Sequence, residues 1–212
     1  KNHRGHNNGR VLFDKALEHC KECAIGLFSV PEMIPFYQKK GFTISENIRF
    51  YSGKATKLNI SLHILPYNEE KHYNDVVSYD KDCFPGDRKE FLKNWLARPN
   101  IYSFVYYDSN NELKGYASIY KSNEEWEISP CCSDSKEIAK ALIGSLLNEI
   151  DEQSDFAFST TTANQSAIDL FEEISSVYKM EKYEHEFAKM YCGTPKAVDS
   201  QKCFCFVSTA IG

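Results

Sequence analysis

The chain has 212 residues, of which 42% are hydrophobic and 14% aromatic, enough to bury the core of one large domain or two small ones. Its formal net charge of −5 excludes the broad basic surface that nucleic acid or an anionic membrane requires. No apolar run approaches the roughly 20 residues that cross a bilayer, and the N-terminus resembles neither a signal peptide nor a transit sequence. We therefore expect a cytoplasmic or nuclear protein with no nucleic-acid or membrane partner.

The first part of the chain predicts two helices that alternate with two strands. Apolar side chains recur with helical spacing over residues 10–22, and residues 24–30 read as a buried strand. A second helix is expected over residues 31–41, because a proline begins it and a glycine ends it. Residues 47–53 predict the strand that follows.

The remaining residues predict a strand, two helices, three strands, a helix, a strand, a helix and two strands. These elements are expected at residues 60–65, 68–84, 87–98, 102–108, 113–120, 124–128, 134–150, 156–160, from 164 onward, 187–191 and 203–209. We expect Asp87 and Glu90 to form a capping box for the second of these helices. Asp134 and Glu137 are expected to cap the long helix that follows the third strand.

The loop that precedes the first helix has the composition of an anion site. It consists of Arg4, Gly5, His6, Asn7, Asn8, Gly9 and Arg10. Glycine and asparagine tolerate left-handed backbone geometry, so consecutive N–H groups can turn toward one point at a helix N-terminus, and that point attracts anions. Residues 1–10 also contain no Asp or Glu. A local anion site on an acidic protein suggests a small phosphorylated ligand.

Cysteine and histidine spacing argues against a metal or a disulfide framework. The eight cysteines lie mostly in apolar or helical stretches and read as free buried thiols. Cys20 and Cys23 have metal-ligand spacing, but no second such pair completes a zinc site. We therefore expect no metal ion.

The order of the expected elements resembles the GNAT acetyltransferase superfamily. Residues 59–212 resemble one complete lobe, and residues 1–58 resemble the C-terminal half of another. The sequences IRFYSG (48–53) and AKMYCG (188–193) occupy the same place in each lobe. The resemblance implies an α+β protein of the GNAT (acyl-CoA N-acyltransferase) fold, with a mixed central sheet flanked by helices. The chain thus looks like a tandem GNAT with an incomplete first lobe.

The resemblance also implies acetyl-CoA as the co-substrate. In this superfamily the pyrophosphate of acetyl-CoA lies on a Q/R-x-x-G-x-G/A loop that opens the third helix. Residues 4–9 match this pattern at Arg4 and Gly9, with Asn7 in place of the middle glycine. In the complete lobe the corresponding segment, residues 128–138, has no glycine, and Asn164, which opens the next helix, is a candidate cofactor contact.

Three residues carry the catalytic roles that the resemblance implies. Tyr37, in the segment PFYQKKGF, is the expected general acid that protonates the leaving CoA thiolate. In the complete lobe Phe171 takes the tyrosine position and cannot donate a proton. Glu125 and Glu127 fall on one face of a strand and are candidate general bases for an amine, and Glu127 lies nearer the splayed end of that strand.

These features predict an acyl-CoA-dependent N-acyltransferase that moves an acetyl group directly from acetyl-CoA to a small-molecule or peptide amine. Two alternatives stay open. One is a catalytically degenerate GNAT module that serves protein association, and the other is a sensor that binds acyl-CoA without transfer. The first four strands of the first lobe would precede Lys1. Either further residues lie upstream, or the half lobe packs on the complete lobe or on a second chain, as in a homodimer.

Overall fold

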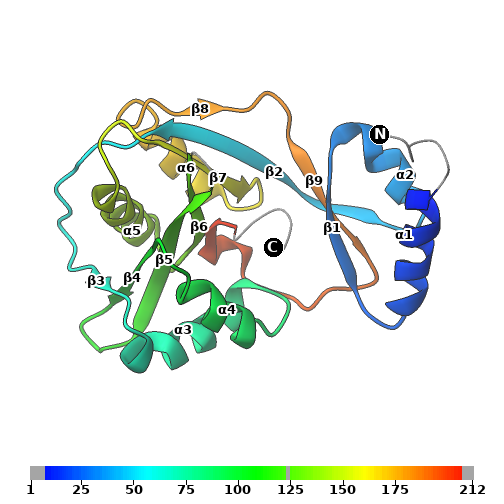
Figure 1. Cartoon of the computed structure of the whole chain (residues 1–212), viewed down its shortest axis with the longest axis horizontal. Coiled ribbons are helices and arrows are strands. Elements are labelled where there is room, and N and C mark those ends of the chain that lie inside the picture. The colour runs from blue at the N-terminus through cyan, green and yellow to red at the C-terminus, as the bar shows by residue number, and fades with distance from the viewer. Residues whose placement is uncertain (1–7, 123–124, 207–212) are drawn as a thin grey trace.

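The computed structural model describes residues 8–122 and 125–206, and it contains one mixed sheet with helices on both faces (Figure 1). The expected α+β class is confirmed. The helices are α1 (Asn8–His19), α2 (Ile34–Gln38), α3 (Glu69–Cys83), α4 (Lys89–Leu96), α5 (Lys136–Glu149) and α6 (Gln165–Ile174), with 3₁₀ turns at Pro31–Met33 and Ser200–Lys202. The strands are β1 (Ile25–Ser29), β2 (Thr43–Lys54), β3 (Leu65–Pro66), β4 (Ile101–Tyr107), β5 (Leu113–Ser122), β6 (Glu125–Ser133), β7 (Asp155–Thr161), β8 (Glu181–Lys182), β9 (Phe187–Cys192) and β10 (Cys203–Cys205).

Two of the expected helix caps are wrong in detail. The Ser135 side chain caps α5 by accepting from the N–H of Ile138, whereas the Asp134 carboxylate turns away and accepts the hydroxyl of Tyr79 at 2.7 Å. Asp87 accepts from the N–H of Lys89, two residues on, so it does not form the capping box with Glu90. At α5 the neighbouring side chain provides the cap, and both helices begin two residues after the expected position.

Several of the expected strands have different lengths, and the strand expected at 47–53 runs from Thr43 to Lys54. Of the segment expected at 60–65 only Leu65 pairs with a neighbour, together with Pro66 that follows it, because the preceding residues cover α5, where Ile60 lies against Gly144. The strand expected at 124–128 continues to Ser133, since β5 and β10 both supply hydrogen-bonding partners for its second half. The last strand covers Cys203–Cys205 rather than 203–209, of which residues 207–209 lie outside the described residues.

The strand order joins both ends of the chain in one sheet. It runs β1-β9-β2-β7-β6-β5-β4-β3, so β9 lies between β1 and β2, and β6 with β7 is the parallel pair among the described strands. The unit β1-α2-β2 has the same order as β7-α6-β9, and β2 and β9 are antiparallel neighbours, with Ile48 opposite Phe187. These two strands contain the similar sequences IRFYSG and AKMYC. The division of the chain near residue 58 stays a prediction.

Three apolar clusters fill the layers around this sheet. Leu142, Leu146 and Phe171 belong to the cluster between the sheet and α5 and α6, and Leu92 and Trp95 of α4 belong to the cluster on the opposite face. A third, smaller cluster forms where α1 and α2 pack on β1 and β9. Helices and strands that are far apart in the sequence are therefore held together by the burial of apolar surface.

Gly53 marks a close approach between β2 and the end of α6. A Cβ atom at this position would lie 2.9 Å from the Phe156 ring and 2.9 Å from the carbonyl oxygen of Tyr178. We expect Gly53→Ala to lower the free energy of unfolding by about 1–3 kcal/mol, because the neighbouring backbone must shift. Urea denaturation measures this, and Gly86→Ala is the matched control, since a Cβ at Gly86 meets nothing within 4 Å. Equal stability of the two variants would contradict the close approach.

Candidate functional site

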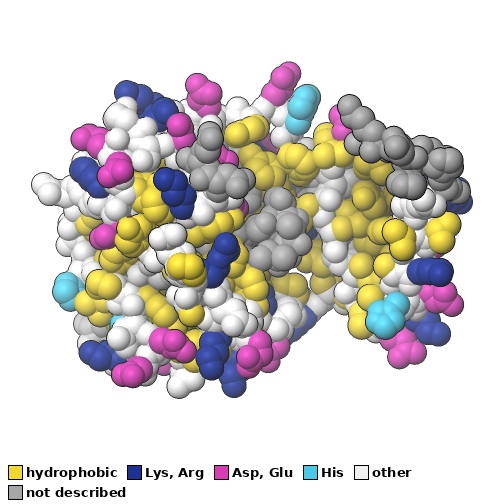
Figure 2. Space-filling view, viewed as in Figure 1, with side chains coloured by type: hydrophobic (Ala, Val, Ile, Leu, Met, Phe, Trp, Pro, Cys, Tyr) yellow, Lys and Arg dark blue, Asp and Glu magenta, His cyan; other side chains and the backbone are white. Residues whose placement is uncertain are grey.

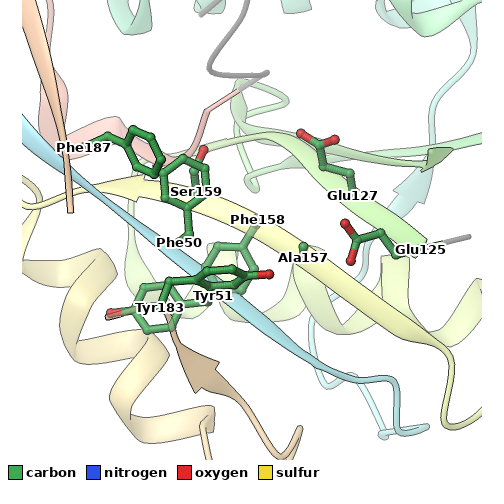
Figure 3. Close-up of a pocket in the computed structure, with 9 residues that line it drawn as sticks. All are labelled: Phe50, Tyr51, Glu125, Glu127, Ala157, Phe158, Ser159, Tyr183 and Phe187. Atoms are coloured by element: carbon green, nitrogen blue, oxygen red, sulfur yellow. The ribbon is translucent and has the colours of Figure 1, made fainter. Parts of the chain in front are cut away.

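A pocket of about 360 Å³ opens on the sheet where β6, β7, β2 and β9 meet (Figure 3). We call it the acidic aromatic pocket. It is lined by Phe50, Tyr51, Glu125, Glu127, Ala157, Phe158, Ser159, Tyr183 and Phe187. Both carboxylates come from β6, as the alternation of side chains along a strand predicts. The sequence thus places Glu125 and Glu127 correctly on one face of one strand, and the structure adds the cavity beside them.

Glu127 and Glu125 have different surroundings. Glu127 is half-buried, accepts a hydrogen bond from the hydroxyl of Tyr120, and pairs with Ala157 at the end of the short parallel contact between β6 and β7. Burial raises the pKa of Glu127, and the hydrogen bond from Tyr120 opposes that rise. Glu125 is exposed. A carboxylate with a raised pKa accepts a proton more readily than an ordinary glutamate, so the surroundings of Glu127 suit the predicted role of general base.

The hydrogen bond from the hydroxyl of Tyr120 lowers the pKa of Glu127. This hydrogen bond favours the charged carboxylate, so Tyr120→Phe should raise the pKa of Glu127 further. If Glu127 must be ionised to act, the rate of acyl transfer falls as the pH drops through this pKa. We therefore expect the acid limb of the pH–rate profile to move to higher pH in Tyr120→Phe. An unchanged acid limb in steady-state assays from pH 5 to 8 would contradict a role for Glu127.

The opening between β6 and β7 is occupied by the chain itself. These strands pair only at Trp126–Phe156 and Glu127–Ala157 and then separate. Strand β10 lies in the gap: Cys203 and Cys205 pair with Cys132 and Cys131 of β6, and the N–H of Phe206 donates to the carbonyl of Ser159 on β7. The side chains of Phe204, Cys205 and Phe206 are buried there.

Asn164 holds this closing segment in place. Its side-chain oxygen caps α6 by accepting from the N–H of Ala167 at 3.0 Å, and its amide nitrogen donates to the carbonyls of Gln201 and Cys203 at 2.7 and 3.0 Å. The residue is fully buried. The polar atoms that were expected to contact a cofactor therefore make hydrogen bonds within the chain in this conformation, and the cofactor role of Asn164 stays a prediction.

The expected pyrophosphate loop lies mostly outside the described residues. Arg4, Gly5, His6 and Asn7 are among the residues that the structure leaves undescribed. Asn8, Gly9 and Arg10 form the exposed first turn of α1, and a Cβ at Gly9 would meet nothing within 4 Å. The described part of the loop is therefore open to solvent at a helix N-terminus.

Tyr37 and Glu127 do not meet in one site. Tyr37 lies in α2 and packs its ring edge-on against Phe13 and Phe42, at the end of the sheet where β2 begins. Glu127 is aligned through Ala157 with Ser52, near the other end of β2. Ser52 follows Thr43 by nine residue steps along β2, which corresponds to about 30 Å. The expected acid and the expected base thus belong to opposite ends of the molecule.

In the segment that was expected to form the complete lobe, phenylalanine stands at the position that corresponds to Tyr37. Phe171 is fully buried between Tyr51 and Phe158. Tyr178, the remote substitute, is packed edge-on against Phe156, and burial raises its pKa to about 12. Neither side chain lines the acidic aromatic pocket.

The sequence does not predict that Tyr120 and several pocket residues belong to the candidate site. Tyr120 faces Glu127 only because β5 and β6 pair in a register that puts these two residues opposite each other. Phe50, Tyr183 and Phe187 gather from β2, the segment after β8, and β9. A strand pattern predicts which face each residue takes, but the pairing of distant strands decides which residues share a pocket.

The end of the sheet at β1 presents a second surface. Within the described residues β1 pairs on one side only, with β9. Figure 2 shows hydrophobic side chains gathered on this half of the molecule, and Val30, Met33 and Ile44 are among the exposed ones. The expected homodimer through this half lobe stays a prediction. No helix in the described part of the chain has the length and apolar character needed to cross a membrane.

Comparison with known proteins identifies relatives of this fold. A family model described as an acetyltransferase (GNAT) domain matches residues 76–204. An uncharacterized Caenorhabditis elegans protein, F36G3.2, is 22% identical over 173 residues, which cover 74% of this chain and 55% of that protein. The uncharacterized N-acetyltransferase YitH of Bacillus subtilis is 24% identical over 141 residues, 64% of this chain and 49% of that protein.

The crystal structure of a putative acetyltransferase from Pyrococcus horikoshii has the same fold. It aligns with a TM-score of 0.79 and 17% sequence identity over 99% of this chain and 68% of that chain. The chain spans about half the length of the two curated relatives.

Proposed function

Because the chain belongs to the GNAT acetyltransferase family, whose model matches more than half of it, we propose that it acts as an acyl-CoA-dependent N-acyltransferase with acetyl-CoA as the donor and an amine as the acceptor. The observation that carries this proposal is the place of Glu127. A half-buried carboxylate with a raised pKa faces a pocket at the point where β6 and β7 separate. A base in that position is what an incoming ammonium group requires.

The proposed reaction proceeds by direct transfer. Glu127 takes one proton from the bound ammonium group, and the resulting free amine attacks the carbonyl carbon of the thioester. A C–N bond forms and the C–S bond breaks. The sulfur leaves as a thiolate and is neutralised by the second proton that the nitrogen loses, so that the products are an amide and free CoA. Glu127 then releases its proton to solvent, and no oxidant or reductant is consumed.

The experiment that tests this function measures both products. Purified protein is incubated with acetyl-CoA and a panel of amines, and free thiol is followed together with the mass of the acylated amine. Amine-dependent thiol release with a matching gain of one acetyl group supports the proposal. Absence of both products with every amine, at protein concentrations comparable to the donor, would reject it.

A separate proposal concerns the binding site of the acyl donor, which residues 4–10 and Tyr37 would form. The loop would hold the pyrophosphate and Tyr37 would protonate the thiolate there. Calorimetric titration of acetyl-CoA into the chain and into an Arg4→Ala, Gly9→Ala variant tests this assignment. Loss of binding in the variant supports the loop, whereas unchanged binding moves the donor to the second lobe. Tyr37→Phe should slow turnover only if the loop binds acetyl-CoA.

A second candidate function is a GNAT module without turnover that serves protein association. The observation that favours it is strand β10, which fills the opening between β6 and β7 with buried side chains, together with Phe171 in the position of the expected acid. This candidate predicts that acetyl-CoA binds neither the chain nor its variants. Measurable acetyl transfer to any amine would exclude it.

A further inference from the structure

Within residues 8–122 and 125–206, the two carboxylates of the acidic aromatic pocket form no ion pair with a basic side chain. None of the ion pairs found among the described residues involves Glu125 or Glu127. Arg98 lies over the rings of Trp95 and Tyr120, and its charge is the smallest of the influences on the pKa of Glu127, which it lowers. The two neighbouring carboxylates therefore make the cavity acidic, which favours a cationic ligand.

The opposite side of the pocket is aromatic. The ring centroids of Phe50 and Phe187 lie 4.8 Å apart and those of Phe50 and Tyr183 lie 6.3 Å apart, in both cases edge to face. Figure 3 shows these three side chains on one side of the pocket and the two carboxylates on the other. Aromatic faces attract a cation through their quadrupole and also bury the apolar body to which the cation is attached.

Ser159 adds a hydroxyl group to the lining of the pocket. The residue is 7% exposed. A serine hydroxyl can both donate and accept a hydrogen bond, so this side chain offers a polar contact to a ligand in the pocket. The volume of about 360 Å³ fits a small molecule or a single side chain.

We propose that the acidic aromatic pocket selects the acceptor, and that the acceptor is a small primary amine that carries one ammonium group on an aromatic or similarly bulky apolar body. The ammonium group lies between Glu125 and Glu127, and the body lies against Phe50, Phe187 and Tyr183. This inference rests on the proposed function, in that it names the acceptor class of the same site. It excludes anionic and uncharged compounds of the same shape.

A matched set of four compounds tests this selection without any acyl donor. The compounds are 2-phenylethylamine, 2-phenylethanol, phenylacetate and butylamine, each titrated into the full chain by calorimetry. We expect 2-phenylethylamine to bind at least about tenfold more tightly than the alcohol, the anion or the amine without a ring. Equal affinity for the alcohol, tighter binding of phenylacetate, or no binding of 2-phenylethylamine would overturn the proposal.

Variants separate the two walls of the pocket. Phe187→Ala should weaken 2-phenylethylamine about tenfold and leave butylamine unchanged, whereas Glu125→Gln with Glu127→Gln should abolish the preference for the amine over the alcohol. Glu152→Gln, an exposed residue outside the pocket, should match the parent chain in every titration. The same variants are compared by circular dichroism, so that loss of binding is scored only in folded protein.

The two proposals fail in different ways. If 2-phenylethylamine binds as expected but no acetyl transfer occurs, the selection stands and the acyltransferase function fails. If acetyl transfer occurs, but the pocket variants bind the accepted amines as tightly as the parent chain does, the acyltransferase function stands and the proposed selection is overturned.

Discussion

Glu127→Gln is expected to lower the rate of acetyl transfer at saturating amine by about 100-fold or more, because removal of a positioned general base typically costs a factor of about 10²–10⁴. Glutamine keeps the size of the side chain and can still accept the hydrogen bond from Tyr120, so the fold should be preserved. The proton of the ammonium group would then have to pass to solvent. Stopped assays of product mass between pH 6 and 9 measure the loss, and it should shrink at high pH where the free amine is more abundant.

Glu125→Gln is the matched control for the Glu127→Gln variant. Glu125 lies two residues away on the same face of β6, but it is exposed and makes no hydrogen bond to Tyr120. We expect its loss to raise KM for the amine several-fold while kcat changes little, because it contributes charge to the pocket without receiving the proton. Equal losses of kcat in the two variants would contradict the assignment of the base to Glu127.

The order of helices and strands could be predicted because its signals are local. Asn68 caps α3 by accepting from the N–H of Lys71, three residues on, and Gly41 adopts a positive φ of 89° after α2. Each of these contacts lies within one turn of chain, so the residue types alone indicate it. The wrong capping residue of α5 is also local, but there Ser135 accepts from the helix N–H group in place of its polar neighbour Asp134.

The arrangement of the strands could not be predicted from such signals. Strand β9 lies between β1 and β2, which precede it by more than 130 residues, and β10 pairs with β6 in a gap that no sequence pattern marks. Pairings of this kind depend on the burial of whole faces and on the exclusion of other partners.

The same difference between local signals and long-range strand pairing explains which features of the candidate site could be predicted. The shared face of Glu125 and Glu127 follows from a period of two, whereas their distance from Tyr37 depends on the full length and pairing of β2.

Strand β10 is the main obstacle to a donor at Glu127. The strand and Phe206 make hydrogen bonds to both β6 and β7, and the side chains of Cys203 and Cys205 are almost completely buried. If the thioester is to reach an amine beside Glu127 through this opening, β10 must leave it. A donor that binds only the open form stabilises that form by mass action, so the population of displaced β10 rises with the donor concentration.

Thiol labelling reports this displacement directly. In the closed form, hydrogen bonding to Cys132 and burial raise the pKa of Cys203, and burial raises the pKa of Cys205, so both react slowly as nucleophiles. We expect acetyl-CoA at about 100 times its Kd for the open form to speed their labelling by up to about 100-fold. Peptide mass spectrometry after short exposure to a maleimide measures each cysteine separately.

Two other cysteines make the labelling result specific. Cys23 is exposed and should react at the same rapid rate with and without acetyl-CoA. Cys83 is buried in α3 beside Cys132, so it should stay protected unless the whole domain unfolds. Faster labelling of Cys203 and Cys205 alone therefore indicates local release of β10 by the donor. Unchanged labelling at donor concentrations that calorimetry shows to be saturating would place the donor away from this opening, and the loop before α1 would then be the site to test.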